Sequence, residues 1–200
     1  MGIIKFLIII IFFCSNTLAR PVSYAGGSTA MMFSNNMNNS IYYHFSPTHK
    51  YSLGLEAIKD KYFSDKYSYF RFTYLINRKN TSLSQRNLYF QFGMDPNNKK
   101  NSLHGVHGDW ETRRLFFGFN IKKIENEVQS YYDNFLNIGF APYLGNYGDI
   151  HTWLMLKSKK NSLTNEYSTY PFLRFFKGNT LLEFGYNEKT SWDIHLVYRI

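Results

Sequence analysis

The chain has 200 residues, of which 20% are aromatic, and it carries a formal net charge of +9. Its mean hydropathy of -0.37 is that of a polar chain. After the N-terminal segment, no stretch approaches the ~20 consecutive apolar residues of a membrane-spanning helix, which excludes a helical membrane protein. The only cysteine, Cys14, excludes a disulfide framework. A chain of this length suits a single domain.

The N-terminal segment predicts an export signal. Lys5 precedes the apolar run "FLIIIIFF", and "TLA" follows shortly after. This is the order of charged region, apolar region and small-residue cleavage site. We expect residues 1–19 to be removed after Ala19, leaving residues 20–200 as the mature domain with a net charge of +8 (22 basic against 14 acidic residues). An uncleaved anchor is the alternative. The bulky residues before the cysteine disfavour lipid attachment there.

Apolar and polar residues then alternate in short runs, which is the period of a β-strand. The alternation predicts strands at 28–34, 40–46, 51–58, 67–77, 86–94, 110–121, 134–142, 150–157, 167–177, 181–187 and 191–200. Turn-forming segments such as "SPTHK" and "DPNNKKN" separate them. An all-β fold follows from this pattern.

The segment "LHGVHGDWE" collects residues that could bind a divalent metal ion, although its two glycines favour a flexible loop. His104, His107 and Asp109 offer nitrogen and oxygen ligands, Glu111 follows them, and His151 offers another nitrogen further along the chain. This set is the candidate site for copper or zinc. The H-x-x-H spacing alone is also compatible with a loop that runs into a strand.

Two pairs of residues are candidates for catalysis. Ser102 with His104 has the residue types of a nucleophile and its base, but the sequence shows no third group to orient the histidine. His151 and Thr152 are adjacent in a predicted strand, so they point to opposite faces and cannot form such a pair. We therefore expect no catalytic residues.

Four lysines, Lys122, Lys123, Lys159 and Lys160, are expected to contact anionic lipopolysaccharide or phospholipid headgroups. The basic residues are scattered along the chain and form no single stripe. This distribution disfavours a nucleic-acid interface.

Near the C-terminus the sequence predicts a specific strand register. A two-residue loop at Gly178–Asn179 places Arg174 opposite Glu183, and a three-residue loop at 188–190 places His195 opposite Glu183. Opposite charges at facing positions support such a register. We interpret this row as a structural polar ladder, with a gate or proton-sensitive constriction as the alternative.

The final strand, "SWDIHLVYRI", alternates apolar and polar residues to the last position. Its apolar members are Trp192, Ile194, Leu196, Tyr198 and Ile200. A closed barrel accounts for an apolar terminus, because the last strand then pairs with the first and its outer face meets lipid. The strand resembles the final strand of bacterial outer-membrane β-barrels, which implies a signal for the barrel assembly machinery, although that pattern prefers phenylalanine at the position of Ile200.

These observations predict a single closed antiparallel up-and-down transmembrane β-barrel. Single-chain bacterial barrels have an even number of strands, whereas eleven segments were found. Either segment 20–27 or segment 122–133 contains another strand, or two segments are one bent strand. We predict ten or twelve strands, with eight as a third alternative.

The interior of such a barrel is expected to be filled by side chains, because narrow barrels leave little free space. The predicted pairing places Gly54 across from Tyr42 and Gly139 across from Trp153. In each pair the glycine gives the bulky side chain room.

Five stretches, "RPVSYAGGST", "FSPTHKYSLG", "DWETRRLF", "APYLGNYGDIHTWLML" and "PFLRFFKGNTLLEFGYN", resemble a family of small proteobacterial outer-membrane proteins without an established activity. The resemblance implies a small barrel in the outer membrane and no cofactor. Our first hypothesis is a non-enzymatic barrel that serves envelope structure or binds or transports a small solute. The alternatives are a barrel that handles copper or zinc ions and, third, a lipid-modifying enzyme.

Overall fold

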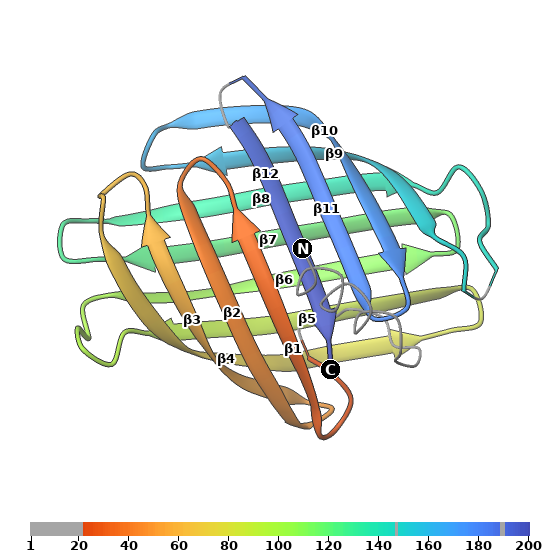
Figure 1. Ribbon diagram of the computed structural model, residues 1–200, viewed down its shortest axis with the longest axis horizontal. Coiled ribbons are helices and arrows are strands. Elements are labelled where there is room, and N and C mark those ends of the chain that lie inside the picture. Colours follow the sequence, from red (N-terminus) through yellow and green to blue (C-terminus); the bar gives the residue numbers. More distant parts are fainter. Residues whose placement is uncertain (1–21, 147, 189–190) are drawn as a thin grey trace, which may run out of the picture.

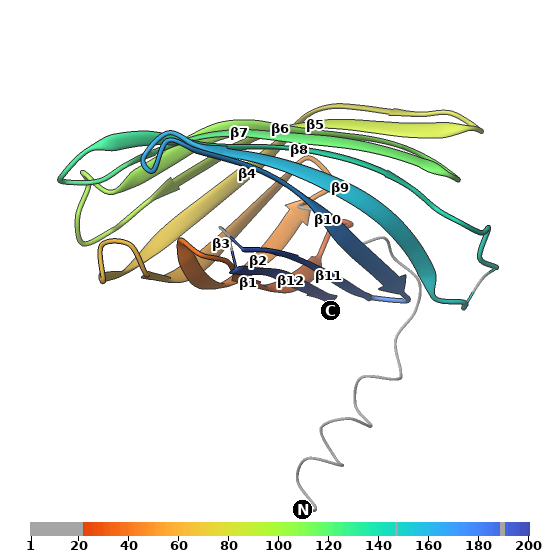
Figure 2. The ribbon, with the colours of Figure 1, turned by 90° about the horizontal axis from the view of Figure 1, so that it is seen from above.

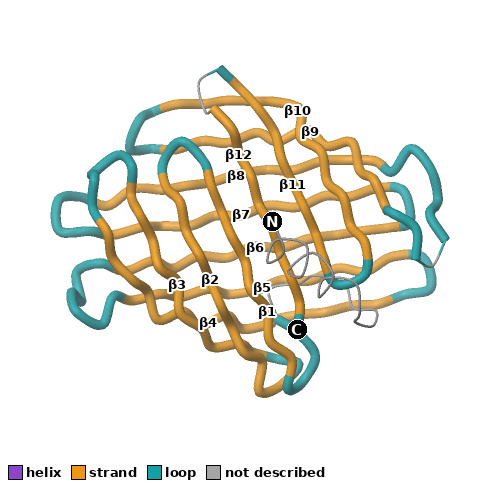
Figure 3. Tube along the Cα trace, viewed as in Figure 1, coloured by secondary structure: helices purple, strands orange, loops and turns teal. Residues whose placement is uncertain are grey.

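The computed structural model describes residues 22–146, 148–188 and 191–200, and these residues fold into twelve β-strands. The strands are β1 (Gly27–Ser34), β2 (Asn38–Thr48), β3 (Tyr51–Asp60), β4 (Lys66–Asn80), β5 (Ser84–Met94), β6 (Ser102–Thr112), β7 (Leu115–Glu125), β8 (Ser130–Phe140), β9 (His151–Asn161), β10 (Glu166–Lys177), β11 (Thr180–Asn187) and β12 (Ser191–Arg199). Figure 3 shows strands joined by short connections. The expected signal peptide, residues 1–19, lies outside the described residues.

Each strand pairs antiparallel with its neighbours in the chain, and β1 pairs with β12 to close the barrel (Figure 1). The prediction of a closed up-and-down barrel is confirmed, with the larger of the two expected strand numbers. Figure 2 shows a flattened cross-section, with β5 to β8 on one side and β1, β2, β11 and β12 on the other. No helix among the described residues is long and apolar enough to cross a membrane.

The two ends of the strand sequence meet at one end of the barrel. The amide of Ser28 donates to the Ile200 carbonyl at 3.3 Å, and the amide of Ile200 donates to the Ser28 carbonyl at 2.9 Å. We call this the terminal end and the opposite one the far end. Because successive strands alternate in direction, the β4–β5 and β8–β9 connections also lie at the terminal end.

Strand alternation sorts the side chains into an apolar outer face and a polar inner face. On β2, Ile41 and Tyr43 are 60% and 49% exposed, whereas Ser40 and His44 are buried. On β12, Trp192 and Ile194 are 55% and 38% exposed, whereas Asp193 and Val197 on the inner face are buried. This is the distribution of a transmembrane barrel, whose outer face contacts lipid. It confirms the orientation predicted for the final strand.

The strand that the sequence reading missed is β6, which lies in the segment expected to be a loop. A methyl group on Gly105 would lie 2.2 Å from the Ile121 carbonyl oxygen, and one on Gly108 would lie 2.7 Å from the Phe119 ring. These glycines permit the neighbouring strands to approach closely, which is a known role of glycine within strands. The region 110–121 is therefore two strands joined at 113–114, and neither the described part of 20–27, which begins at residue 22, nor 122–133 supplies an additional one.

The C-terminal register is confirmed. Arg174 pairs with Glu183, and Glu183 pairs with His195. Two other predicted pairings are wrong. Gly54 lies opposite His44 instead of Tyr42, because the β2–β3 turn is tight and a register shift follows Phe45.

The predicted partner of Gly139 is also wrong by two positions, because Gly139 lies opposite Met155 instead of Trp153. The β8–β9 connection spans residues 141–150 and is not a tight turn. The facing residues of β8 and β9 could therefore not be predicted by counting outward from a tight turn.

We predict that Gly105→Ala destabilises the barrel by about 1–3 kcal/mol, as overpacking does, because the added methyl group would meet rigid backbone. Gly118→Ala is the matched control, since its methyl group would meet the outer atoms of the Phe116 ring. Urea unfolding in detergent or lipid, followed by loss of heat-modifiable gel mobility, measures both. Equal stabilities of the two variants would contradict this packing argument.

Candidate functional site

The interior of the barrel contains a cavity of about 1020 Å³ that is lined by residues from all twelve strands. Asn35 and Asn38 line it at the far end, while Leu83 and Gly145 line it at the terminal end. The cavity therefore extends along the barrel between its two ends. The expectation of a filled interior is wrong.

One part of the lumen wall is a chain of polar contacts across β3, β4, β5 and β7. The Arg71 guanidinium forms an ion pair with Glu56 and donates to Gln91 Oε1 at 3.1 Å. The Gln91 amide then donates to Asn120 Oδ1 at 2.6 Å. The inward-facing position between them on β6 is Gly105, so the two amides meet across a residue without a side chain.

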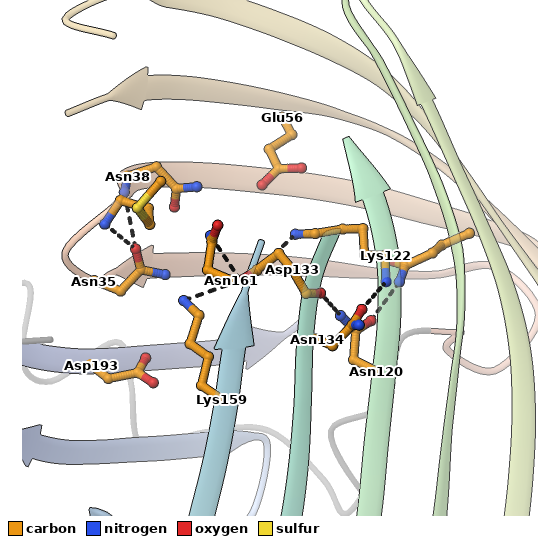
Figure 4. A network of polar contacts seen from close by, with 12 residues as sticks. Asn35, Asn38, Glu56, Asn120, Lys122, Asp133, Asn134, Lys159, Asn161 and Asp193 are labelled. Carbon is orange, nitrogen blue, oxygen red and sulfur yellow. Dashed lines mark hydrogen bonds and ion pairs between the residues drawn. The ribbon is translucent and has the colours of Figure 1, made fainter. Parts of the chain in front are cut away.

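Asp133 on β8 is the centre of a second group of contacts (Figure 4). Lys122 Nζ on β7 lies 3.8 Å from Asp133 Oδ2, and Lys159 Nζ on β9 lies 3.5 Å from Asp133 Oδ1. The Asn161 side-chain amide also donates to Asp133 Oδ1 at 3.5 Å, and the Asn120 side-chain amide donates to the Asp133 backbone carbonyl at 3.3 Å. One carboxylate therefore balances lysines from both neighbouring strands.

A third group of polar contacts lies on the C-terminal strands. Together the three groups form a belt of ion pairs and amides around the lumen. Lys157 Nζ and the Tyr170 hydroxyl each donate to Asp193 Oδ2 at 2.6 Å. The predicted row of three is also present. Arg174 Nε donates to Glu183 Oε1 at 2.5 Å, and His195 Nδ1 lies 2.7 Å from Glu183 Oε2.

Most of these contacts connect adjacent strands, but Gln91–Asn120 skips β6 and Lys157–Asp193 joins β9 to β12 past β10 and β11. A cavity remains alongside them. The His195 ring also stacks on Phe33 of β1 at 4.1 Å between centroids. The belt of ion pairs and amides consequently reaches nearly every strand. This geometry, together with twelve strands, explains why the interior holds a cavity.

An apolar cluster lies inside the barrel toward the far end. Its buried members are Ile58, Tyr69, Leu103, Ile124 and Tyr131, with Phe63, Tyr67 and Leu163 packed against them. Phe63 and Leu163 come from the β3–β4 and β9–β10 connections. Several members also line the cavity. The far mouth is thus bordered by aromatic and aliphatic side chains.

At the terminal end, the segment before β1 folds inside the wall. Val22 is 2% exposed and packs with Leu75 and Tyr89 from the inner faces of β4 and β5. The amide of Ser23 donates to Ser46 Oγ at 2.9 Å. This segment therefore occupies space inside the barrel beside β4 and β5. No sequence pattern predicted it, because the segment is short and follows the expected cleavage site.

The structure does not bring the four predicted metal ligands together. His104 is exposed and lies outside the cavity, whereas His107 and Asp109 face the lumen on the same strand. The His107 ring stacks on Tyr89, and Asn87 donates to Asp109 at 2.7 Å. His151 lies on β9, three strands away from β6. Within the described ranges, no group of three or more His, Cys, Asp or Glu side chains is placed to hold a metal ion.

The catalytic pair is not formed as a nucleophile and base. The Ser102 hydroxyl donates to Glu125 Oε2 at 3.2 Å instead of to the His104 ring. Glu125 is also held by Lys123 Nζ at 2.6 Å. The serine therefore belongs to a surface group of polar contacts between β6 and β7.

The lysine expectation is corrected for two of the four residues. Lys122 and Lys159 line the cavity and pair with Asp133, so they face the lumen and not the lipid headgroups. Lys123 and Lys160 are not among the residues that line the cavity. Inward and outward lysines alternate here because adjacent residues of a strand point to opposite faces.

A scan against family models and a search of curated proteins found no match. Among solved structures, the chain resembles a KdgM porin in complex with disordered oligogalacturonate, with a TM-score of 0.54 and 13% identity. It also resembles a KdgM porin with a TM-score of 0.52 and 13% identity. Each comparison covers 86% of this chain and 98% of the other.

At this identity the likeness establishes a shared fold. The chain shares with them the fold of a small closed antiparallel β-barrel, and the apolar outer face described above is that of transmembrane strands.

We predict that the Arg174–Glu183 pair is energetically coupled. A double-mutant cycle with Arg174→Met and Glu183→Gln should give a coupling free energy of about 0.5–3 kcal/mol, as contacting residues do, because both side chains are largely buried. The exposed Lys123–Glu125 pair is the control and should show weaker coupling. Chemical unfolding of the refolded barrel measures both cycles. Equal coupling in the two pairs would contradict a structural role for the lumen row.

Proposed function

We propose that this chain is a non-enzymatic outer-membrane barrel that conducts or binds small polar solutes in its lumen. The observation that carries the proposal is the cavity of about 1020 Å³, which is lined from all twelve strands and reaches residues at both ends. A barrel whose only task was to reinforce the envelope would have no need of such a space. The resemblance to porins, one of them in complex with oligogalacturonate, supports the same reading.

The proposal includes the route to the membrane. Residues 1–19 would direct export and be cleaved after Ala19. The assembly machinery would recognise the final strand, and the outward lysines would contact lipopolysaccharide.

We predict that Ile200→Asp lowers the amount of folded barrel in the outer membrane several-fold, because it puts a charge on the apolar outer face of the final strand. Ile200→Phe is the matched control and should assemble at least as well as the original chain. Membrane fractionation followed by heat-modifiable gel mobility measures folded protein in each case. Equal amounts of both folded variants would contradict the proposed role of the final strand.

We predict that Asn137→Trp lowers single-channel conductance by about twofold or more, because the larger side chain projects into the lumen and pore diameter limits passage. Ile138→Trp is the matched control, since that neighbour is 47% exposed on the outer face. Planar-bilayer recordings of the refolded proteins measure the effect. Conductance that responds equally to both substitutions would show that ions do not pass through the lumen.

A further inference from the structure

The charged side chains that line the cavity balance one another. Six are basic, namely Arg71, Arg113, Lys122, Lys157, Lys159 and Arg174, and six are acidic, namely Glu56, Asp109, Glu111, Asp133, Glu183 and Asp193. The whole chain, by contrast, is strongly basic. The positive charge of the protein is therefore not concentrated in its lumen.

Five of the six basic residues also form ion pairs with specific carboxylates. Arg71, Lys157 and Arg174 each contact their own carboxylate, while Lys122 and Lys159 share Asp133. A cation that is already bound to a carboxylate attracts a passing anion weakly, because the two fields cancel over a few ångströms.

Three of these cations also pack against aromatic faces. The Arg174 guanidinium lies 4.0 Å from the centroid of the Phe116 ring, and Lys157 Nζ lies 4.8 Å from that of Phe135. Arg71 lies 5.1 Å from the Tyr42 ring centroid. These cation–π contacts further stabilise the positive charges within the barrel wall.

Uncharged polar atoms, in contrast, remain available at the cavity. Asn137 Oδ1, His107 Nε2 and His195 Nε2 are buried, line the lumen and form no hydrogen bond with the described residues. An amide oxygen accepts a hydrogen bond, and a ring nitrogen donates or accepts one according to its tautomer. These groups complement hydroxyl groups of a solute.

Aromatic side chains complete the lining. Trp153, Phe176 and Tyr143 surround the terminal half of the cavity, together with Phe116. Aromatic faces offer apolar surface to the C–H face of a sugar ring, while the amides bind its hydroxyl groups. Few precisely placed polar groups among aromatic ones are typical of ligand sites.

From this lining we infer that the lumen selects uncharged, hydroxyl-rich solutes, of the class of short neutral saccharides, over acidic saccharides. The inference rests on the proposed function and specifies its substrate class. It differs from what the oligogalacturonate complex of the structural neighbour alone would suggest, since galacturonate carries a carboxylate on each unit. The difference follows from the charge pairing in this chain.

The test uses the refolded mature chain in proteoliposomes and planar bilayers. Liposome swelling compares a neutral disaccharide with digalacturonate, and reversal potentials in a potassium chloride gradient give the permeability ratio of the two ions. We expect the neutral disaccharide to enter at least about threefold faster, and potassium and chloride to permeate within about twofold of each other, since the residues that the structure describes form no ring of unpaired charge around the cavity.

Two variants remove carboxylates from the belt. Asp193→Asn leaves Lys157 without its carboxylate, and Glu183→Gln does the same for Arg174. Each should shift permeability toward chloride and accelerate digalacturonate entry by about threefold or more. Glu127→Gln, at an exposed position of the β7–β8 connection, is the control and should change neither. Heat-modifiable mobility confirms that every variant is folded.

The outcomes separate the inference from the proposed function. Faster entry of digalacturonate than of the neutral sugar, or strong chloride selectivity of the unaltered chain, would overturn the inference and leave a conducting barrel. Folded variants whose selectivity equals that of Glu127→Gln would also overturn it. If no sugar enters and no current flows, the proposed function itself fails, and the inference fails with it.

Discussion

The structure depends on one constraint, which is that every backbone amide and carbonyl must find a hydrogen-bond partner inside a hydrocarbon layer. A sheet satisfies this constraint only when its two edge strands pair with each other. Pairing of β1 with β12, from Thr29–Arg199 to Ser34–Ile194, provides that closure. Once the barrel is closed, strand alternation leaves a single arrangement, with apolar side chains toward lipid and polar ones toward the lumen.

The polar interior creates a second requirement, because charges in a confined lumen need partners. This chain meets it with pairs and shared carboxylates along the wall, such as Asp133 between two lysines. Most of the contacts connect neighbouring strands and so reinforce the wall, while Lys157 and Asp193 join β9 to β12 past two intervening strands. The cavity of about 1020 Å³ remains alongside these contacts. In the proposed role, the charge balance that stabilises the barrel would also determine which solutes its interior favours.

The fold could be predicted because period-two alternation is strong, and the hairpin of β10 and β11 could be placed because Gly178–Asn179 defines a two-residue turn. Where no short turn fixes the register between two strands, the predicted pairing was wrong. The bend after Phe45 and the ten-residue connection before β9 each displaced a predicted glycine pairing by two positions.

The missed strand has a different cause. The glycines of β6 allow the neighbouring strands to approach closely, but in the sequence they look like the glycines of a loop. The candidate metal ligands were therefore assigned to a loop, whereas they lie on a strand. Within the candidate site, the row of Arg174, Glu183 and His195 could be predicted because it depends on two hairpins with short loops. The Asp133 group could not, since it also depends on the register between β8 and β9, which follows a ten-residue connection. The buried position of Val22 depends on tertiary packing that no local pattern encodes.

The most direct test of this account is the orientation of successive side chains along the final strand in a lipid bilayer. Single cysteines at positions 192 to 197, in a mature chain that lacks Cys14, would carry spin labels whose collisions with oxygen and with a water-soluble nickel chelate are compared. The account predicts oxygen-rich, lipid-facing labels at 192, 194 and 196, and labels shielded from lipid at 193, 195 and 197. The opposite phase, or no period of two, would contradict it.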